Sequence, residues 1–101
     1  MKRDEAIARL RRHLPALRAE GVRGVGLFGS TARDEARADS DVDLLLDVDF
    51  EAKPSFSLFD LARIQMMLQD DLGVPVQPIV SAGSLPRMRA NIERDLIPIV
   101  G

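Results

Sequence analysis

Two aspartates separated by a single residue, Asp41 and Asp43, are the side chains of this sequence best suited to chemistry. On an extended strand alternate residues project to one face, so the two carboxylates would lie roughly 6–7 Å apart along the chain. No lysine or arginine stands between Arg37 and Lys53, a stretch that holds six acidic residues. Hard divalent cations such as Mg²⁺ bind carboxylate oxygens and share their remaining ligands with phosphates. The pair is therefore a candidate metal site, and an acidic, solvated strand face is the alternative interpretation.

A possible phosphate-binding turn, Gly29-Ser30, precedes the acidic pair. Ten residues lie between Ser30 and Asp41. We expect a turn from a strand into a short helix here, with Ser30 as the N-cap. The free N–H groups and the positive dipole of such a helix start suit a phosphate, which the Ser30 hydroxyl can also contact. Arg33, one turn later, could reach the same anion with its forked guanidinium. A surface salt bridge from Arg33 to Asp34 or Glu35 is the alternative.

A phosphate-binding turn beside an acidic metal site supplies the groups needed for metal-assisted phosphoryl or nucleotidyl transfer. The pattern Gly-Ser-x10-Asp-x-Asp lies between apolar runs at 25–28 and 44–46. This pattern resembles that of the polymerase-beta-like nucleotidyltransferase superfamily. The whole chain, from its N-terminal helix through residues 57–61 to the ending at 97–100, is similar to the small minimal nucleotidyltransferase (MNT) proteins of bacteria and archaea.

The resemblance implies an α/β fold in which helices pack on a small mixed β-sheet of three to four strands. It also implies a nucleoside triphosphate substrate, for which ATP is our hypothesis, with its triphosphate at Gly29 and Ser30. From its position one turn later, we expect Arg33 to assist. Two Mg²⁺ ions would be held by Asp41 and Asp43, which would be the catalytic residues. MNT proteins are commonly antitoxins paired with a HEPN-domain toxin, an RNase, and some transfer AMP from ATP to a tyrosine of that toxin. The implied function is a Mg²⁺-dependent protein adenylyltransferase that acts as an antitoxin.

The sequence departs from the superfamily pattern at two positions. Catalytically competent members bring a third carboxylate from a later strand, and Gln77 stands where that acid is expected. No acidic residue lies between Asp71 and Glu93. An amide oxygen can coordinate a metal, but an amide cannot serve as a general base. The second departure is Asp34, where many relatives have glycine, and its carboxylate adds negative charge near the proposed phosphate site.

The resemblance, together with these departures from it, leads to two hypotheses of different classes. The first is an active nucleotidyltransferase that adenylylates its partner. The second is a catalytically weak or inactive protein of the same fold, which neutralises its partner by occlusion; the glutamine in place of the third carboxylate favours it.

Composition excludes several other classes of protein. The 101 residues correspond to a single domain, 1–101, and are 46% hydrophobic and 30% charged with a net charge of −2. This balance disfavours disorder and direct, stable nucleic-acid binding by phosphate neutralisation. The absence of cysteine and the presence of one histidine, His13, exclude disulfides, thiolate zinc and His-rich metal sites. No apolar run is long enough to span a membrane and the start is charged, so we expect a cytoplasmic protein with no membrane contact.

The spacing of apolar residues predicts the element order α-β-α-β-α-β-α. The expected helices cover 3–20, a short turn from residue 30, 57–72 and 85–96, and the expected strands cover 22–28, 42–48 and 74–80. Pro15 should end or kink the first helix. Ser57 should cap the third helix, and Gly73 should end it. Pro78 places the last strand near a sheet edge, whereas three consecutive leucines at 44–46 predict a strand covered on both faces.

Two motifs in the sequence are misleading. Residues 24–29 spell G-x-G-x-x-G, but the glycines fall within a predicted strand and not between a strand and a helix, as dinucleotide binding requires. Residues 39–43 mimic the start of an EF-hand loop. Leu44 stands where that loop needs glycine and Phe50 where it needs glutamate, so this interpretation fails.

The third predicted helix is unusually apolar. We expect Phe56, Phe59, Met66 and Met67 to lie mostly in the core. Residues 58–68 are nevertheless apolar on more than one face, so part of this helix would remain available as a partner interface.

Overall fold

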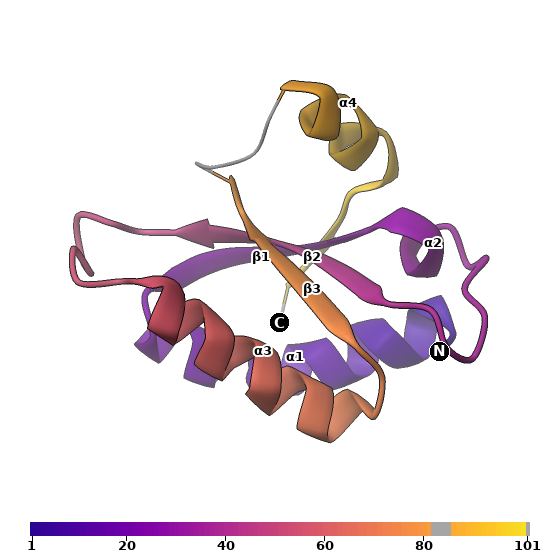
Figure 1. The fold of residues 1–101 in the computed structure, drawn as a ribbon, viewed down its shortest axis with the longest axis horizontal. Coiled ribbons are helices and arrows are strands. Elements are labelled where there is room, and N and C mark those ends of the chain that lie inside the picture. The colour runs from indigo at the N-terminus through magenta and orange to yellow at the C-terminus, as the bar shows by residue number, and fades with distance from the viewer. Residues whose placement is uncertain (82–85, 101) are drawn as a thin grey trace.

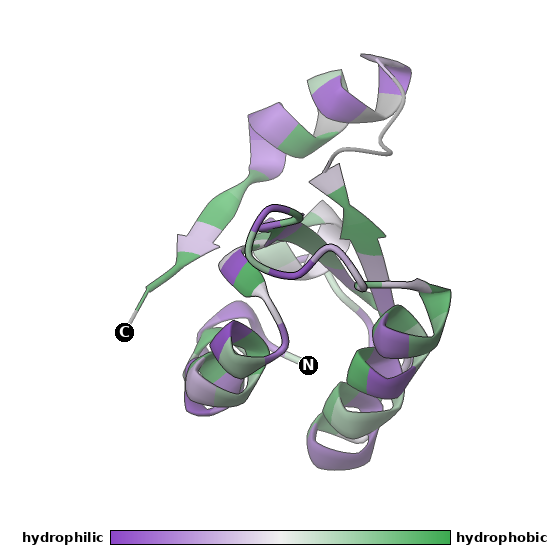
Figure 2. Ribbon diagram, turned by 90° about the vertical axis from the view of Figure 1, so that its left-hand side faces the viewer, coloured by the Kyte–Doolittle hydropathy of each residue, from purple (hydrophilic) through white to green (hydrophobic). Residues whose placement is uncertain are grey.

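The fold is a four-stranded sheet with helices on both faces (Figures 1 and 2). The structure is a computed structural model. It describes residues 1–81 and 86–100, apart from the side chains of residues 88 and 91. The elements are α1 (Arg3–Ala19), β1 (Val22–Phe28), α2 (Gly29–Ala32), β2 (Val42–Val48), α3 (Leu58–Leu72), β3 (Val76–Val80), α4 (Pro86–Asp95) and β4 (Ile97–Ile99). Helices α1 and α3 lie side by side under one face of the sheet, and α4 lies over the other face.

The strand order is β3-β2-β1-β4, with β1 antiparallel to β2 and β4 and with β2 parallel to β3. The predicted mixed sheet is confirmed, as is the edge position of β3, where Pro78 lies. The predicted element order ends with a helix, whereas the chain continues after α4 into a fourth strand, β4. Its residue Ile99 pairs with Val25 and is buried, because the free edge of β1 needs hydrogen-bond partners and the tail supplies them.

The hydrophobic core lies between the sheet and the pair α1 and α3. Along β2 the buried residues alternate with partly exposed ones, and the buried set is Val42, Leu44, Leu46 and Val48. Leu45 is only partly buried, so the expectation that both faces of this strand would be covered is met in full on the core face and only in part on the other. The other face carries Asp43, Leu45 and Asp47, because side chains alternate along a strand. The acidic pattern of β2 therefore points away from the core.

Helix α1 continues through Pro15 to Ala19, so the helix does not end at this proline, which was one of the two outcomes expected there. Proline in a helix interior removes one hydrogen bond and costs about 3 kcal/mol. Leu10, Leu14 and Leu17, on both sides of the proline, are buried against the core. Each buried leucine contributes about 1.5–3 kcal/mol, so their combined burial outweighs the cost of the proline.

Both predicted ends of α3 are confirmed. Ser57 is the N-cap, and the Asp60 carboxylate accepts a hydrogen bond from the Ser57 backbone N–H at 2.8 Å. This bond, followed by the one that the Arg63 guanidinium donates, holds the pKa of Asp60 below its ordinary value. Gly73 ends the helix in the left-handed conformation, with φ of 73°, which glycine adopts without a steric penalty.

The outer surface of α3 differs from expectation. Phe59 and Met66 are 86% and 64% exposed, so the prediction that they lie in the core is wrong, whereas Phe56 and Met67 pack partly against it. Leu58, at 81% exposure, extends the same apolar surface. The sheet faces α3 on one side only, and the helix has more apolar residues than that side can bury.

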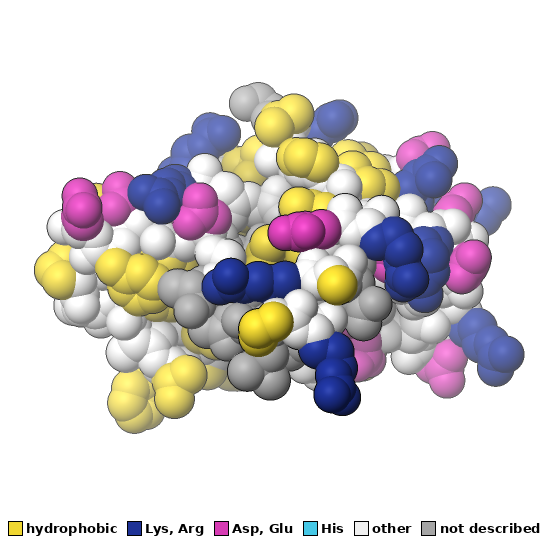
Figure 3. All heavy atoms as spheres, turned by 90° about the horizontal axis from the view of Figure 1, so that it is seen from above, with side chains coloured by type: hydrophobic (Ala, Val, Ile, Leu, Met, Phe, Trp, Pro, Cys, Tyr) yellow, Lys and Arg dark blue, Asp and Glu magenta, His cyan; other side chains and the backbone are white. Residues whose placement is uncertain are grey.

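Charges of both signs lie close together on the face of the sheet that α4 covers. Figure 3 looks onto this face, where Lys and Arg side chains lie among Asp and Glu side chains. Within the described part of the chain, no helix combines the length and the apolar character needed to cross a bilayer.

Candidate active site

The acidic pair lies at the end of the sheet where β1 stops and where β2 and β3 begin. Asp41 directly precedes β2 and is exposed, and Asp43 is the second residue of the strand and is half-buried. Asp43 pairs with Phe28 on one side and with Gln77 on the other. Because β1 is antiparallel to β2, the turn after Phe28 returns to this same end of the sheet.

The two carboxylates interact electrostatically. Partial burial raises the pKa of Asp43 above its ordinary value, and the negative charge of Asp41 raises it further, while the Arg33 guanidinium opposes both effects. The site therefore concentrates negative charge that a bound cation would neutralise.

Gly29 lies directly against the Asp43 carboxylate. Its φ of 77° is in the left-handed region, and a Cβ added there would collide with Oδ2 of Asp43 and lie 3.2 Å from Cγ. A side chain at position 29 is thus excluded both by backbone conformation and by space. The structure thus brings the predicted turn and the predicted acidic pair into contact, although Gly29 and Asp41 are more than ten residues apart in the sequence.

Helix α2 begins two residues earlier than an N-cap at Ser30 implies. The N-cap is Phe28 and not Ser30, because the carbonyl of Gly29 already accepts a hydrogen bond from the Arg33 N–H at 3.2 Å. Ser30 lies in the first turn, half-buried, and its carbonyl accepts a bond from the Glu35 N–H at 2.8 Å. Ser30 therefore does not cap this helix, and its hydroxyl has no capping role.

Gln77 occupies the neighbouring strand position beside Asp43, in the parallel register that places both side chains on one face. Among the described residues, no group of three or more acidic or histidine side chains could enclose a metal. Two carboxylates and an adjacent amide still offer hard oxygen donors, which suit Mg²⁺. Asp41, Asp43 and Gln77 thus fit such an ion by the chemistry of their donors.

The sequence of this chain is similar to those of known proteins. The family model described as "Nucleotidyltransferase domain" matches residues 8–98. The chain belongs to this nucleotidyltransferase family. The family and fold expected from the Gly-Ser-x10-Asp-x-Asp pattern are confirmed.

Individual relatives of this nucleotidyltransferase agree with the assignment. The protein adenylyltransferase MntA of Thermococcus cleftensis is 36% identical over 77 residues, which cover 76% of this chain and 74% of that protein. A solved chain reported as "Structure of putative minimal nucleotidyltransferase" has 37% identity and a TM-score of 0.80, and the match covers 97% of this chain and 96% of that one. A crystal structure of a toxin–antitoxin with AMP-PNP shares the fold, with a TM-score of 0.71 at 15% identity over 100% of this chain and 74% of that chain.

Arg33 of the nucleotidyltransferase forms ion pairs at the rim of the site. Its Nε donates to Glu35 at 3.1 Å and its Nη1 donates to Asp95 at 2.6 Å. The salt bridge to Glu35 is one of the two alternatives expected from sequence. The bond to Asp95 was not expected, because 62 residues separate the partners and no local pattern links them.

Two further residues shape the turn. Asp34 has a φ of 60°, and its carboxylate accepts a hydrogen bond from the Arg3 N–H at 3.0 Å. The left-handed backbone explains why glycine suits this position. The hydrogen bond places the Asp34 carboxylate at the N-terminus of α1. Thr31, missed by sequence reasoning, is fully buried, and its Oγ1 lies 3.5 Å from the carbonyl oxygen of Asp41.

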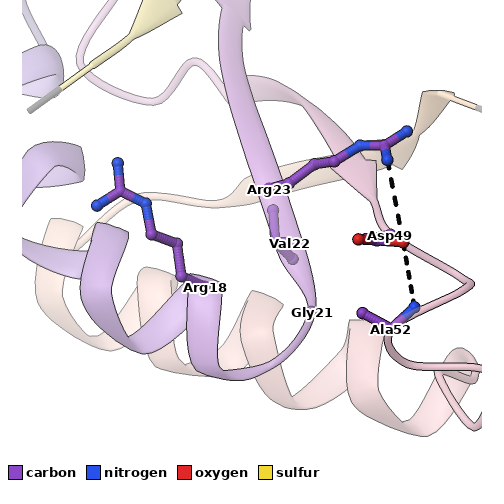
Figure 4. A pocket seen from close by; sticks show the side chains of 6 residues that line it. All are labelled: Arg18, Gly21, Val22, Arg23, Asp49 and Ala52. Carbon is purple, nitrogen blue, oxygen red and sulfur yellow. Dashed lines mark hydrogen bonds and ion pairs between the residues drawn. The ribbon is translucent and has the colours of Figure 1, made fainter.

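Two small pockets lie away from the acidic pair. One, of about 220 Å³, lies at the opposite end of β1 and includes Arg18, Arg23 and Asp49 (Figure 4). Figure 4 shows Arg23 reaching toward Asp49 while Arg18 points away from them, so the two guanidinium groups do not converge on one anion. The other, of about 160 Å³, lies on the sheet between Leu45 and Leu96.

Asp43→Asn is expected to raise the free energy of unfolding at pH 7 without Mg²⁺ by up to about 1 kcal/mol, because solvent screens part of the effect. A carboxyl whose pKa is raised by folding destabilises the native state once it ionises, so the wild type loses stability as pH rises through this pKa. The amide introduced at position 43 does not ionise, so the variant does not lose this stability. Urea unfolding of the variant and the wild type, with and without Mg²⁺, measures the difference in the free energy of unfolding.

The matched control is Asp47→Asn, on the same strand and face. The Asp47 carboxylate accepts a hydrogen bond from Arg23 at 3.0 Å, so its removal should not stabilise the protein. Equal stabilisation by both substitutions would show that general charge reduction, and not the site, is responsible.

Proposed function

We propose that this chain is a Mg²⁺-dependent nucleotidyltransferase that transfers AMP from ATP to a HEPN-type toxin and so acts as its antitoxin. The observation that carries the proposal is the close approach of the Gly29 turn to the Asp43 carboxylate, with Asp41 beside it. Phosphate-binding backbone and metal-binding carboxylates at one point suit a nucleoside triphosphate and its cation.

Each residue then has a chemical role. The backbone at Gly29 and the hydroxyl of Ser30 would seat the terminal phosphates, with Arg33 assisting as a charged donor. Asp41 and Asp43 would hold the metal, with two ions expected and with Gln77 at the third-ligand position. When bound, Mg²⁺ would neutralise charge that develops on the phosphates during transfer.

The acceptor and partner are inferred from relatives and from the surface. The similar protein of T. cleftensis is named a protein adenylyltransferase, and toxin–antitoxin structures share this fold. The outer surface of α3 exposes Leu58, Phe59 and Met66, which is unusual for side chains of this size unless a partner covers them. A protein acceptor that docks on apolar residues agrees with both observations.

A second candidate function is partner neutralisation by occlusion, without catalysis. The observation that favours it is the neutral Gln77 beside Asp43, where a third carboxylate would otherwise complete the site. In that case the apolar surface of α3 would carry the function and the acidic pair would be vestigial.

Calorimetric titration of ATP with Mg²⁺ into the purified protein tests the nucleotide site. The expected result is metal-dependent binding that Asp41→Asn/Asp43→Asn abolishes. The matched control is Asp47→Asn/Asp49→Asn, which makes the same change of charge at the same spacing at the far end of β2, where both residues pair with Arg23.

Binding that is lost in the first double variant and kept in the second would support nucleotide binding at the acidic pair. No binding by the folded wild type would contradict the stand-alone nucleotide site and would favour the occlusion function. Equal loss in both double variants would indicate a general electrostatic effect and would also contradict the site.

A further inference from the structure

The last turn of α4 reaches the candidate active site through Asp95. The Arg33 guanidinium has one carboxylate partner from its own loop, Glu35, and a second, Asp95, from the C-terminal end of α4. In Figure 1, α4 lies across the sheet from α1 and α3, and α2 lies at the end of the sheet, where it contacts α4. The chain thus brings a residue from its C-terminal region to the turn that follows β1.

The two partners of Arg33 differ in how firmly they are held. The Asp95 side chain is 6% exposed, whereas that of Glu35 is 65% exposed. An almost buried carboxylate needs paired cations, and Asp95 also accepts a bond from Arg94 at 3.4 Å. The bond from Arg33 to Asp95 is the shorter of its two, at 2.6 Å. Asp95 therefore sets the direction of the guanidinium more than Glu35 does.

Packing at the start of β4 fixes Asp95 itself. Leu96 follows Asp95 directly and sits on Gly26 of β1, where a Cβ would collide with Cδ1 of Leu96 and lie 3.2 Å from its Cγ. Ile97 then pairs with Leu27. The position of Asp95 is thus determined by the sheet and not by α4 alone.

The orientation of Arg33 suits an anion beside the acidic pair. Its positive charge acts on Asp43, so the guanidinium lies within electrostatic range of that carboxylate. The two ion pairs use Nε and Nη1, and no hydrogen bond among the described residues uses Nη2. Nη2 therefore has donors left for a further acceptor.

We propose that Asp95 is a positioning residue of the nucleotide site, which holds Arg33 so that Nη2 faces the triphosphate. This inference rests on the proposed function. A long arginine side chain loses rotamer freedom when it binds a phosphate, and the bond to Asp95 removes that freedom before the nucleotide arrives. Asp95 contacts no phosphate itself and acts only through Arg33.

The test is a double-mutant cycle on the affinity for ATP with Mg²⁺, measured by calorimetry on the full chain. Asp95→Asn is expected to weaken binding about tenfold, as removal of a supporting partner commonly does. In an Arg33→Gln background the same substitution should cause no further loss. Glu93→Gln is the matched control, because it removes one charge from an exposed position on the same helix. If Asp95→Asn does not fold, Asp95→Glu replaces it, with an expected loss of at least threefold.

Unchanged affinity in Asp95→Asn, or an equal loss in the Arg33→Gln background, would overturn the proposal. Tighter binding would overturn it too, because Asp95 would then compete with the phosphate for Arg33. A purely structural role would lower the melting temperature without changing the affinity of the folded protein.

A nuclear magnetic resonance measurement separates this inference from the proposed function. The Arg33 Nε–H signal, identified by its loss in Arg33→Gln, should show a high heteronuclear NOE in the wild type and in Glu93→Gln but a reduced one in Asp95→Asn. If the wild type binds no ATP, the proposed function fails while this measurement still decides whether Asp95 orders Arg33. An unchanged NOE in Asp95→Asn would refute the positioning role.

Discussion

Gln77→Asp is expected to raise the rate of AMP transfer by about 10²–10⁴-fold, the usual contribution of a positioned general base. Position 77 lies beside Asp43 in the parallel register of β2 and β3, so a carboxylate there would join the acidic pair. It could accept the proton of the attacking hydroxyl, which an amide cannot do. The measurement is incorporation of labelled AMP into a HEPN-type toxin by the purified variant.

Gln77→Asn is the matched control, because asparagine has the size of aspartate without its charge. The expected rate for this control is that of the wild type or less. A third carboxylate should also make the free protein less stable without Mg²⁺, since the pKa of Asp43 is already raised by burial and by Asp41. If the aspartate and asparagine variants transfer AMP equally fast, position 77 is not the third-ligand position or does not limit the rate.

Gly29→Ala is expected to weaken binding of ATP with Mg²⁺ by up to about 10²-fold, because disturbing the groups that orient a metal-binding carboxylate costs about 10–100-fold in metal affinity. The new Cβ would collide with Oδ2 of Asp43 and force either the carboxylate or the turn to move. The left-handed φ of 77° adds a strain of about 1–2 kcal/mol. Calorimetry gives the affinity, and urea unfolding gives the stability.

Gly73→Ala separates the two effects of that substitution. Gly73 has a similar φ of 73°, but a Cβ there would have no atom within 4 Å. The Gly73→Ala variant should therefore lose the same stability of about 1–2 kcal/mol but bind ATP with Mg²⁺ as tightly as the wild type does. If Gly29→Ala binds ATP as tightly as Gly73→Ala does, the contact between Gly29 and Asp43 is not part of the nucleotide site.

Local signals in the sequence were enough for most of the elements and for the family. The spacing of Gly29-Ser30 from Asp41 and Asp43 is a short-range pattern, and the family comparison confirms what it indicated. The ends of α3 at Ser57 and Gly73 were predictable because capping depends on neighbouring residues only. Where tertiary packing competes with a local preference, the local signal is not enough: α1 does not end at Pro15, because the leucines on both sides of it are buried.

The sequence by itself determined which groups the chain possesses: a glycine turn, two alternate aspartates, and a glutamine in place of a third acid. Only the tertiary structure decided which of them meet. Strand register places Gln77 beside Asp43, and the antiparallel return of the tail as β4 brings Asp95 to Arg33. Such contacts join residues tens of positions apart. They follow from which strands pair and which faces are buried, and these depend on the packing of the whole core rather than on neighbouring residues.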